Sequence, residues 1–590
     1  MSQEASDAPV SARRWPVVAV VLLAPALALL LTPIRISTGG LDPMTYLGYL
    51  NGYDALAVRF PQTYHGNRIA YLLVDRTAMS LLGFEAGYFA VRGVLLALAA
   101  AAMARIGWRL GGPALAVLGA TLVTLVPWLS RQLLWTHYDG FAATYLLLAA
   151  ALLVGRRRPS PWAELGAGVL LGLAVNTNLV MFGMCGALGL AWIIARRHDP
   201  LRAVLPSVGR VVLGVALALL ATSLVLSTWY PDGPFFSETV AFRFALELGS
   251  EAEFYVPMQR WIGRVPVLWF LPLLVVLLAV ALRWWPAASA MTLAPGAGGA
   301  PSPDDAGADR RWMVEFALIW LAVMVAVMLF ANFVWLRPWP RLPYYRVHLL
   351  PATLTAVLAL VAVARERGGA RVDRAALVGA AAIAALWVVG VTLVDAARIA
   401  TVVVMLGLAL GVALLRRPGP APVLVGLLAP LLLVSAWGTR GLGEWEGPRS
   451  SARATAEREW DIVGIGLEMQ DLIESEVPLD RNVRFWHAME GDDVSVHLGL
   501  AAMYYGLGEN NLHRRKSDEY SGMPDLEDGN VLELVESARP MTAVLLGASR
   551  EDVGEGYAEL VGAGLPAAVR RSDLLEGEGL AVHVLLVDID

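Results

Sequence analysis

The chain has 590 residues, of which 57% are hydrophobic and only 16% are charged, and its mean hydropathy is +0.58. Soluble domains are nearer half apolar and a quarter charged, so this composition predicts a polytopic α-helical membrane protein. The net charge of −5 argues against a nucleic-acid-binding protein, and the single cysteine, Cys185, excludes an internal disulfide and a CxxC metal or redox site.

Apolar runs near the twenty residues that a helix needs to cross a bilayer recur along the chain. The first run follows Arg13 and Arg14 but has no small-residue cleavage site after it, so a retained helix is expected instead of a signal peptide. About thirteen transmembrane helices are predicted, near 16–33, 84–104, 112–130, 140–154, 162–180, 181–195, 207–228, 265–283, 312–333, 348–364, 375–394, 398–415 and 421–438.

Arginine in the short connections predicts the orientation of these spans. Alternate connections are rich in arginine, and the positive-inside rule makes their side cytoplasmic. The N-terminus is therefore expected in the cytoplasm, and residues 34–83, the turn before residue 140 and everything after about 440 on the outer side. The arginine-rich connections are Arg13/Arg14, Arg105/Arg109, 155–161, 195–202, 309–311, 364–374 and 416–419.

Composition divides the chain into four parts. Residues 1–285 form a first transmembrane module whose outer loop, 34–83, contains TYLGYLNGYDAL and NRIAYLLVDRTAMSLLG. These stretches have helical spacing but are too short or too polar to span, so they are expected to lie in the interface. The Pro/Gly/Ala-rich segment 286–311 predicts a flexible cytoplasmic linker to a second transmembrane module, 312–439. In 440–590 strand-like and helix-like runs alternate, which predicts a soluble extracytoplasmic α/β domain.

Two acids stand at the outer ends of predicted spans. Asp42, in STGGLDPM, follows the first span, where partial loss of water would raise the pKa of its carboxyl group and make it a usable base. Asp139, in LWTHYDGF beside His137, directly precedes another span. Each acid could instead cap a helix N-terminus. Two acids on the same side can also converge on one pocket, which favours a functional interpretation.

Basic and aromatic residues on the same side suggest an anionic ligand. The stretch YHGNRIAYLLVDR could hold phosphate in bidentate fashion through its arginine, although a snorkelling arginine is the simpler interpretation. The stretch VWLRPWPRLPYYRVHLLP places arginines among Trp and Tyr rings, where the alternative is an aromatic belt with interfacial arginines. Acids on one wall and arginines with aromatic rings on another suit a phosphorylated sugar. The candidate binding residues are His65, Arg68, His137, Arg341, Tyr345, Arg346 and His348.

The order and sidedness of these features over about residues 15–365 resemble the glycosyltransferase C superfamily. The span start YDGFAATYLLLAAALL and the later start YYRVHLLP are most similar to bacterial relatives of the protein O-mannosyltransferases and lipid A aminoarabinose transferases. The resemblance implies that Asp42 is the catalytic base, that Asp139 shapes the acceptor site, and that Arg346, with Arg68, contacts the donor phosphate. It also implies a polyprenyl-phosphate sugar donor and inversion at the anomeric centre.

The chain departs from that pattern at the first acid. Many relatives carry two adjacent acids there, whereas this sequence reads LDPM. One acid favours a metal-independent mechanism without a cofactor, and the question of a divalent metal stays open. Near the C-terminus, FWHAMEGDDVSVHL is more typical of a surface strand with an acidic turn than of a metal site. Its candidate ligands are His487, Glu490, Asp492, Asp493 and His497.

The predicted function is therefore a glycosyltransferase of the bacterial inner membrane that acts at the outer face, in the assembly of envelope glycan or glycoprotein. One alternative is a transporter or flippase of lipid-linked sugars, which would need charges at mid-bilayer and related halves. The predicted spans are nearly free of charge, the polar run at 176–178 being the main exception. A second alternative, a non-catalytic envelope scaffold, leaves the outward acids and arginines unexplained.

Overall fold

The structure is a computed structural model. It describes a bundle of long helices, a layer of short helices and an α/β part with one sheet. The described residues are 15–31, 42–60, 65–125, 133, 138–154, 159–179, 181–229, 303–333, 342–381 except 369, 371, 375 and 379, 449–487, 494–504, 511–513, and 539–590 except 563. The spans predicted near 265–283, 398–415 and 421–438, together with His137 and Arg341, lie outside these residues.

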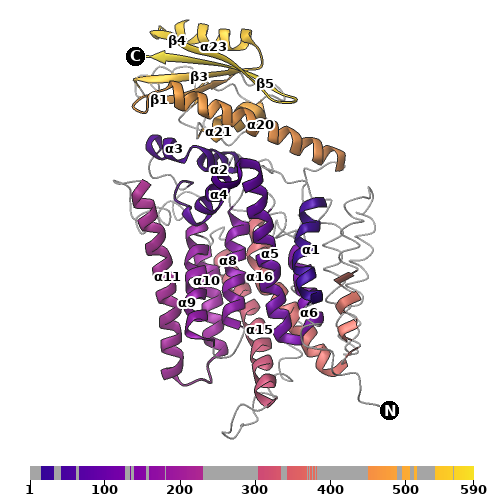
Figure 1. The fold of residues 1–590 in the computed structure, drawn as a ribbon. Coiled ribbons are helices and arrows are strands. Elements are labelled where there is room, and N and C mark those ends of the chain that lie inside the picture. The colour runs from indigo at the N-terminus through magenta and orange to yellow at the C-terminus, as the bar shows by residue number, and fades with distance from the viewer. Residues whose placement is uncertain are drawn as a thin grey trace.

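Apolar helices form a bundle in which each helix overlaps a predicted span (Figure 1). They are α1 (Trp15–Leu31), α5 (Phe84–Gly111), α6 (Pro113–Leu125), α8 (Asp139–Val154), α9 (Pro161–Thr177), α10 (Met181–Ala195), α11 (Leu201–Trp229), α15 (Pro303–Phe333) and α16 (Leu342–Gly368). Helix α15 begins at Pro303, inside the segment 286–311 that the sequence predicts to be a flexible linker. Its first turns carry enough charged residues to look like a linker by composition, although they continue the helix.

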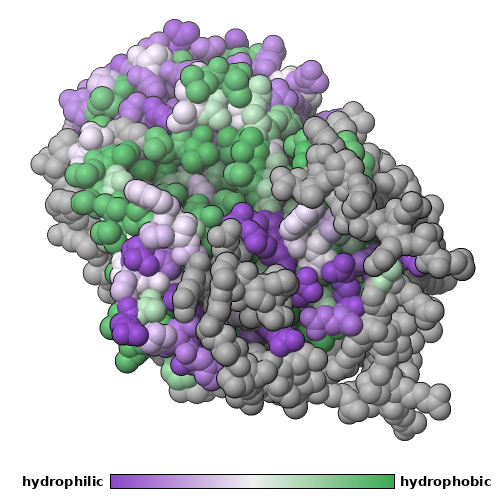
Figure 2. Space-filling view, turned by 60° about the horizontal axis from the view of Figure 1, so that its bottom comes forward, coloured by the Kyte–Doolittle hydropathy of each residue, from purple (hydrophilic) through white to green (hydrophobic). Residues whose placement is uncertain are grey.

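The bundle has the surface expected of a membrane protein. Within the described residues, Phe84–Gly111, Leu201–Thr228 and Leu349–Glu366 are long and apolar enough to cross a bilayer, and several shorter helices are equally apolar. Leucine and valine side chains of α11 such as Leu205, Val212 and Leu220 are exposed. Figure 2 shows hydrophobic residues gathered in a band with hydrophilic residues above and below it. A band of this kind is stable against lipid tails and costly in water.

Short connections between neighbouring helices rest on local chain chemistry. Gly112 joins α5 to α6 with a φ of +85°, a conformation that only glycine adopts without strain, and Pro113 then starts α6. Ser160 caps α9 by accepting a hydrogen bond from the backbone nitrogen of Ala163, at 3.2 Å, ahead of Pro161 at the first helical position. These signals fix where the long helices turn back on one another.

Three short helices lie across one end of the bundle, as the amphipathic pattern of residues 34–83 predicts (Figure 1). They are α2 (Asp42–Asn51), α3 (Tyr53–Arg59) and α4 (Ile69–Leu82). The tyrosines of the pattern, among them Tyr46, Tyr49 and Tyr53, are fully buried in the same core as the long helices. The outer loop is therefore a packed layer on the bundle.

The carboxyl-terminal part has an α/β arrangement and rests on that layer (Figure 1). Its strands are ordered β2-β1-β3-β5-β4, with β1 parallel to β2 and β3, and β5 antiparallel to β3 and β4. Every residue of β3 is buried, as in a central strand. The elements are α20 (Arg449–Glu476), β1 (Asn482–His487), α21 (Val494–Met503), β2 (Asn511–His513), β3 (Met541–Gly547), α23 (Arg550–Gly562), β4 (Ala567–Glu576) and β5 (Ala581–Ile589).

Candidate functional site

A cluster of polar and aromatic side chains lies where α2, α4, α8 and α9 meet, at the end of the bundle that the three short helices cover. Helices α8 and α9 are antiparallel neighbours, so the start of α8 and the end of α9 fall at the same level. The turn that precedes α4 packs against both. Three candidate residues from the sequence, His65, Arg68 and Asp139, come from this turn and from the first residue of α8.

Asp139 is buried at the N-terminus of α8, where the helix dipole favours an acid. Its Oδ1 accepts a hydrogen bond from Nδ2 of Asn178 at 2.6 Å. Asn178 is the C-cap of α9, and its extended backbone (φ −147°, ψ 118°) turns the chain away from the helix. The carboxylate is therefore both at a helix start, as a capping role requires, and tied across to the neighbouring helix.

Arg68 is half-buried and lies against an aromatic ring. Its guanidinium carbon is 3.3 Å from the centroid of Tyr138 and 5.7 Å from that of Tyr46, and its Nη1 donates to the carbonyl oxygen of Thr177 at 2.8 Å. Stacking on tyrosine holds the planar guanidinium in one orientation and favours the cation electrostatically. Arg68 and Asp139 thus belong to one cluster, because the ring of Tyr138, the residue before Asp139, contacts the arginine.

Aromatic rings enclose this polar group. The ring of Tyr46 packs edge-to-face on His65, Tyr71 and Tyr138, with centroids 5.0, 5.4 and 5.5 Å apart, and Tyr71 continues the contact to Phe141 at 4.8 Å. Edge-to-face geometry is the preferred one for such pairs. Burial, followed by the negative charge of Asp75, raises the pKa of Tyr71 well above its usual value, so Tyr71 is neutral at physiological pH.

The polar run Asn176–Thr177–Asn178 supports the site with all three residues. Asn176 Oδ1 accepts from the backbone nitrogen of Ala70 at 2.8 Å. The carbonyl oxygen of Thr177 accepts from Arg68, and the side chain of Asn178 donates to Asp139. Sequence reasoning treated this run only as an exception to the apolar spans. Its place at the outer end of a span, on the side of the candidate acids, was the signal that could have assigned it to the site.

A buried ion pair below the cluster was also missed. Nη1 of Arg92, on α5, lies 2.5 Å from Oδ1 of Asp75, on α4, and both side chains are fully buried. The Arg92 guanidinium is 3.6 Å from the ring centroid of Tyr88 and 5.6 Å from that of Phe141. Asp75 lies four residues after Tyr71 on the buried face of α4, and a charge on an otherwise apolar face is the pattern that marks such a pair.

The remaining candidates are described only in part. Asp42 is the first residue of α2 and Pro43 the second, so a helix does start at this acid, while its side chain lies outside the described residues. The same holds for Tyr345, Arg346 and His348, whose backbone forms the first turns of α16.

In the carboxyl-terminal part, His487 ends β1 and the buried His497 lies on α21, whereas Glu490, Asp492 and Asp493 lie outside the described residues. Over the part of the chain that the structure describes, no three His, Cys, Asp or Glu side chains are grouped so that they could hold a metal ion.

Comparison with known proteins finds similarity at the level of solved structures. No family model matches the sequence, and no curated protein matches it. ArnT from Cupriavidus metallidurans bound to undecaprenyl phosphate is similar with a TM-score of 0.48 and 16% identity, covering 97% of this chain and 98% of that one. ArnT from the same organism in the apo state gives 0.45 and 16%, covering 98% of both chains.

ArnT is a lipid A aminoarabinose transferase with a glycosyltransferase C fold, so these neighbours come from the group that the sequence resembles. The likeness extends over nearly the whole of both chains.

Proposed function

We propose that the chain is a membrane glycosyltransferase that moves a sugar from a polyprenyl-phosphate donor to an acceptor hydroxyl at the outer face of the membrane, with inversion. The observation that carries the proposal is the aromatic-walled cluster that joins Arg68 and Asp139 at the outer end of apolar helices. Transfer from a lipid phosphate needs a carboxylate that can act as a base and a cation that can stabilise the leaving phosphate, both at the membrane boundary. The cluster supplies the cation, Arg68, and the carboxylate of Asp139, and Asp42 at the first residue of α2 supplies the proton acceptor.

Each candidate residue has a role in that reaction. Asp42, at the first residue of α2, takes the proton of the acceptor hydroxyl, and Asp139 shapes the acceptor site. The acceptor oxygen attacks the anomeric carbon from the face opposite the bond to phosphate, and the electron pair of that bond leaves with the polyprenyl phosphate. Arg68 stabilises the developing phosphate charge, because its guanidinium is already oriented by Tyr138. Arg341, Tyr345, Arg346 and His348 complete the donor side, and His65 and His137 line the pocket.

The proposed setting is the inner membrane of a bacterium, with the N-terminus cytoplasmic and the carboxyl-terminal domain extracytoplasmic, in assembly of envelope glycan or glycoprotein. Arginine supports this orientation, because Arg105, Arg109, Arg196 and Arg197 lie at or near the ends of α5 and α10 that are remote from the cluster. The partners are the donor lipid, the bilayer and an envelope acceptor.

A transfer assay in vesicles or detergent with polyprenyl-phosphate sugars tests the proposal. Asp42→Asn should lower turnover by about 10²-fold or more, the size of effect expected for loss of a general base. Arg68→Ala should raise the KM for the donor. Arg76→Ala is the matched control, because Arg76 lies on the same α4 layer but pairs with the exposed Asp54, at 2.8 Å.

Two results would contradict the proposal. Full activity of Asp42→Asn removes Asp42 from catalysis. No turnover of the wild type with any polyprenyl-phosphate sugar favours transport of lipid-linked sugars, which a flip assay with the same lipids would then detect.

A further inference from the structure

Helix α2 lies between the candidate site and the carboxyl-terminal domain. On one side Tyr46 packs into the aromatic cluster with His65 and Tyr138. On the other side Gly48 and Gly52, one helical turn apart, contact α21 and α20. The spacing of Tyr46 and Gly48 thus places an aromatic ring toward the site and bare backbone toward the domain.

The contact between α2 and α21 is a backbone approach that only glycine allows. A β-carbon at Gly48 would lie 1.6 Å from the backbone oxygen of Met503, the last residue of α21. At Gly52 it would lie 2.0 Å from Nε2 of Gln470, on α20. A side chain at Gly48 would push the domain and α2 apart, because the opposing atoms are backbone, whereas one at Gly52 would displace the Gln470 side chain.

A buried glutamine joins the same two surfaces. Gln470 has no exposed surface; its Nε2 donates to the carbonyl oxygen of Gly48 at 3.2 Å, and its Oε1 accepts from Nδ2 of Asn51 at 3.1 Å. Both the donor and the acceptor group of this amide are therefore satisfied by α2 alone. A buried amide paired in this way specifies one register between two elements.

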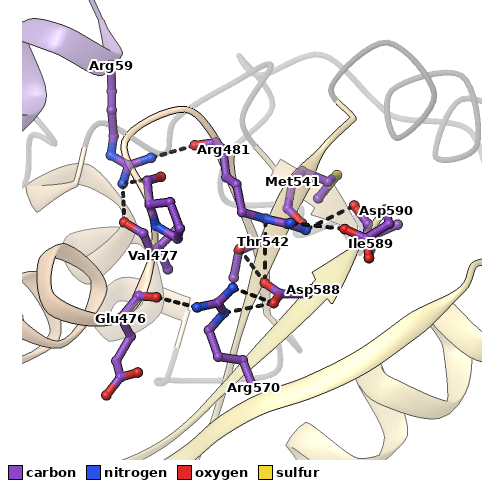
Figure 3. Close-up of polar contacts among 11 residues, drawn as sticks. Arg59, Glu476, Val477, Arg481, Met541, Thr542, Arg570, Asp588, Ile589 and Asp590 are labelled. Carbon is purple, nitrogen blue, oxygen red and sulfur yellow. Dashed lines mark hydrogen bonds and ion pairs between the residues drawn. The ribbon is translucent and has the colours of Figure 1, made fainter.

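Arg59, at the end of α3, binds the turn that follows α20 (Figure 3). Its guanidinium donates to the carbonyl oxygens of Arg481, Val477 and Pro478, at 2.5, 2.9 and 3.2 Å. These carbonyls follow the carboxyl end of α20, where the helix dipole is negative and favours an arginine. The outer loop thus holds the turn that joins α20 to β1.

The turn that Arg59 binds is also attached to the sheet. Arg481 donates to the carbonyl oxygen of Met541 and to the carboxylate of Asp590, each at 2.9 Å, so the turn holds the start of β3 and the end of the chain (Figure 3). A displacement of the sheet would therefore be transmitted to Arg59 and α3. At the other end of the interface, Trp460 of α20 stacks on Phe89 of α5, with centroids 5.9 Å apart.

We propose that the carboxyl-terminal domain is a clamp that fixes α2 above the candidate site, with Gly48, Gln470 and Arg59 as positioning residues. The proposal covers the position and rigidity of α2. Its consequence for turnover rests on the proposed function, because α2 begins at Asp42 and carries Tyr46.

Hydrogen–deuterium exchange of the full-length protein in lipid nanodiscs tests the clamp. Gly48→Ala should make the amides of residues 44–59 exchange about tenfold faster or more, the change expected when one methyl overpacks a tight contact. Gly464→Ala is the matched control, because Gly464 lies on α20 with nothing within 4 Å of an added β-carbon. Arg59→Ala and Gln470→Ala leave the backbone contact intact and should give smaller changes in the same segment.

Turnover separates the clamp from the proposed function. In an active enzyme Gly48→Ala should lower kcat while Gly464→Ala leaves it unchanged. Unchanged exchange in 44–59 for all three interface variants would overturn the clamp. Faster exchange without any change in kcat would support the clamp and overturn its consequence for turnover. If the wild type is inactive toward every donor, the proposed function fails, and the exchange result still decides whether the domain fixes α2.

Discussion

The Asp75–Arg92 pair shows how strongly a single buried residue can constrain this protein. Neither side chain has exposed surface, and the Arg92 guanidinium lies against the rings of Tyr88 and Phe141. Removing two charges from water is costly, and the pair is tolerable only because each partner neutralises the other. It ties α4, which follows Arg68, to α5.

Removing one partner should therefore be far worse than removing both. Asp75→Ala, or Arg92→Leu, should lower the free energy of unfolding by about 3–5 kcal/mol, because an uncompensated charge stays buried. The double variant should lose less than the sum of the two. Thermal unfolding in detergent measures this, and additive losses would contradict a coupled pair.

The ring of Tyr138 is a second case in which one residue matters, because it orients the guanidinium of Arg68. Tyr138→Phe keeps the face on which Arg68 stacks, so under the proposed function it should leave binding of a polyprenyl phosphate nearly unchanged. Tyr138→Leu removes that face and should weaken binding by about 2- to 30-fold, the range of a cation–π contact. Equal affinities of the Phe and Leu variants, measured by a lipid-binding titration, would show that the stack does not prepare Arg68 for phosphate.

At the scale of elements, a charged network joins helices at the end of the bundle remote from the site. Glu164 of α9 is buried and accepts from Nε of Arg210 on α11 at 2.5 Å, while Nη1 of Arg196, after α10, lies 3.8 Å away. Arg196 also pairs with Asp199 at 3.0 Å. These contacts fix the turn between α10 and α11 against α9.

Glu164→Gln should lower the free energy of unfolding by about 1–3 kcal/mol, because the amide keeps a hydrogen bond but leaves Arg210 without its charge partner and Arg196 with Asp199 alone. Glu315→Gln is the matched control: Glu315, on α15, pairs with the more exposed Arg197, and its loss should be below about 1 kcal/mol. Equal melting temperatures of the two variants would contradict a special role for the buried acid.

The elements themselves follow closely from the sequence, because apolar length and helical spacing are local properties. The long helices of the bundle overlap predicted spans, and the stretches of the outer loop form the short helices α2, α3 and α4 as expected. The exception is the start of α15, where a Pro/Ala/Asp composition typical of a linker also suits a helix N-terminus. Local composition cannot separate these two outcomes.

At the scale of the whole molecule, acidity should loosen the carboxyl-terminal domain. Burial alone would raise the pKa of the Asp588 carboxyl, but hydrogen bonds from Arg570 and Thr542 and the charge of Arg481 outweigh it and lower the pKa below its ordinary value. A depressed pKa contributes stability that is present above the ordinary value, near 4, and is lost as the pH falls through the folded value.

Asp588→Ala should therefore lower the melting temperature at pH 7, by an amount equivalent to about 1–3 kcal/mol for its bonds to charged and polar donors. The difference from wild type should shrink as the pH falls below 4. Asp573→Ala, which removes a more exposed partner of Arg571, provides the control and should change little. A difference that stays constant with pH would show that the charge of Asp588 contributes nothing.

The sequence by itself determined the helical membrane character, the order of the spans and the position of Asp139, His65 and Arg68 along the chain. Periodicity and apolar length are properties of residues that are neighbours in the sequence, so they can be recognised before the fold is known. Only the tertiary structure decided that Asn176–Thr177–Asn178 binds the start of α4, Arg68 and Asp139, that Asp75 meets Arg92, and that Gly48 touches Met503. These contacts join residues from 17 to several hundred positions apart, and their partners are selected by packing and charge pairing in three dimensions.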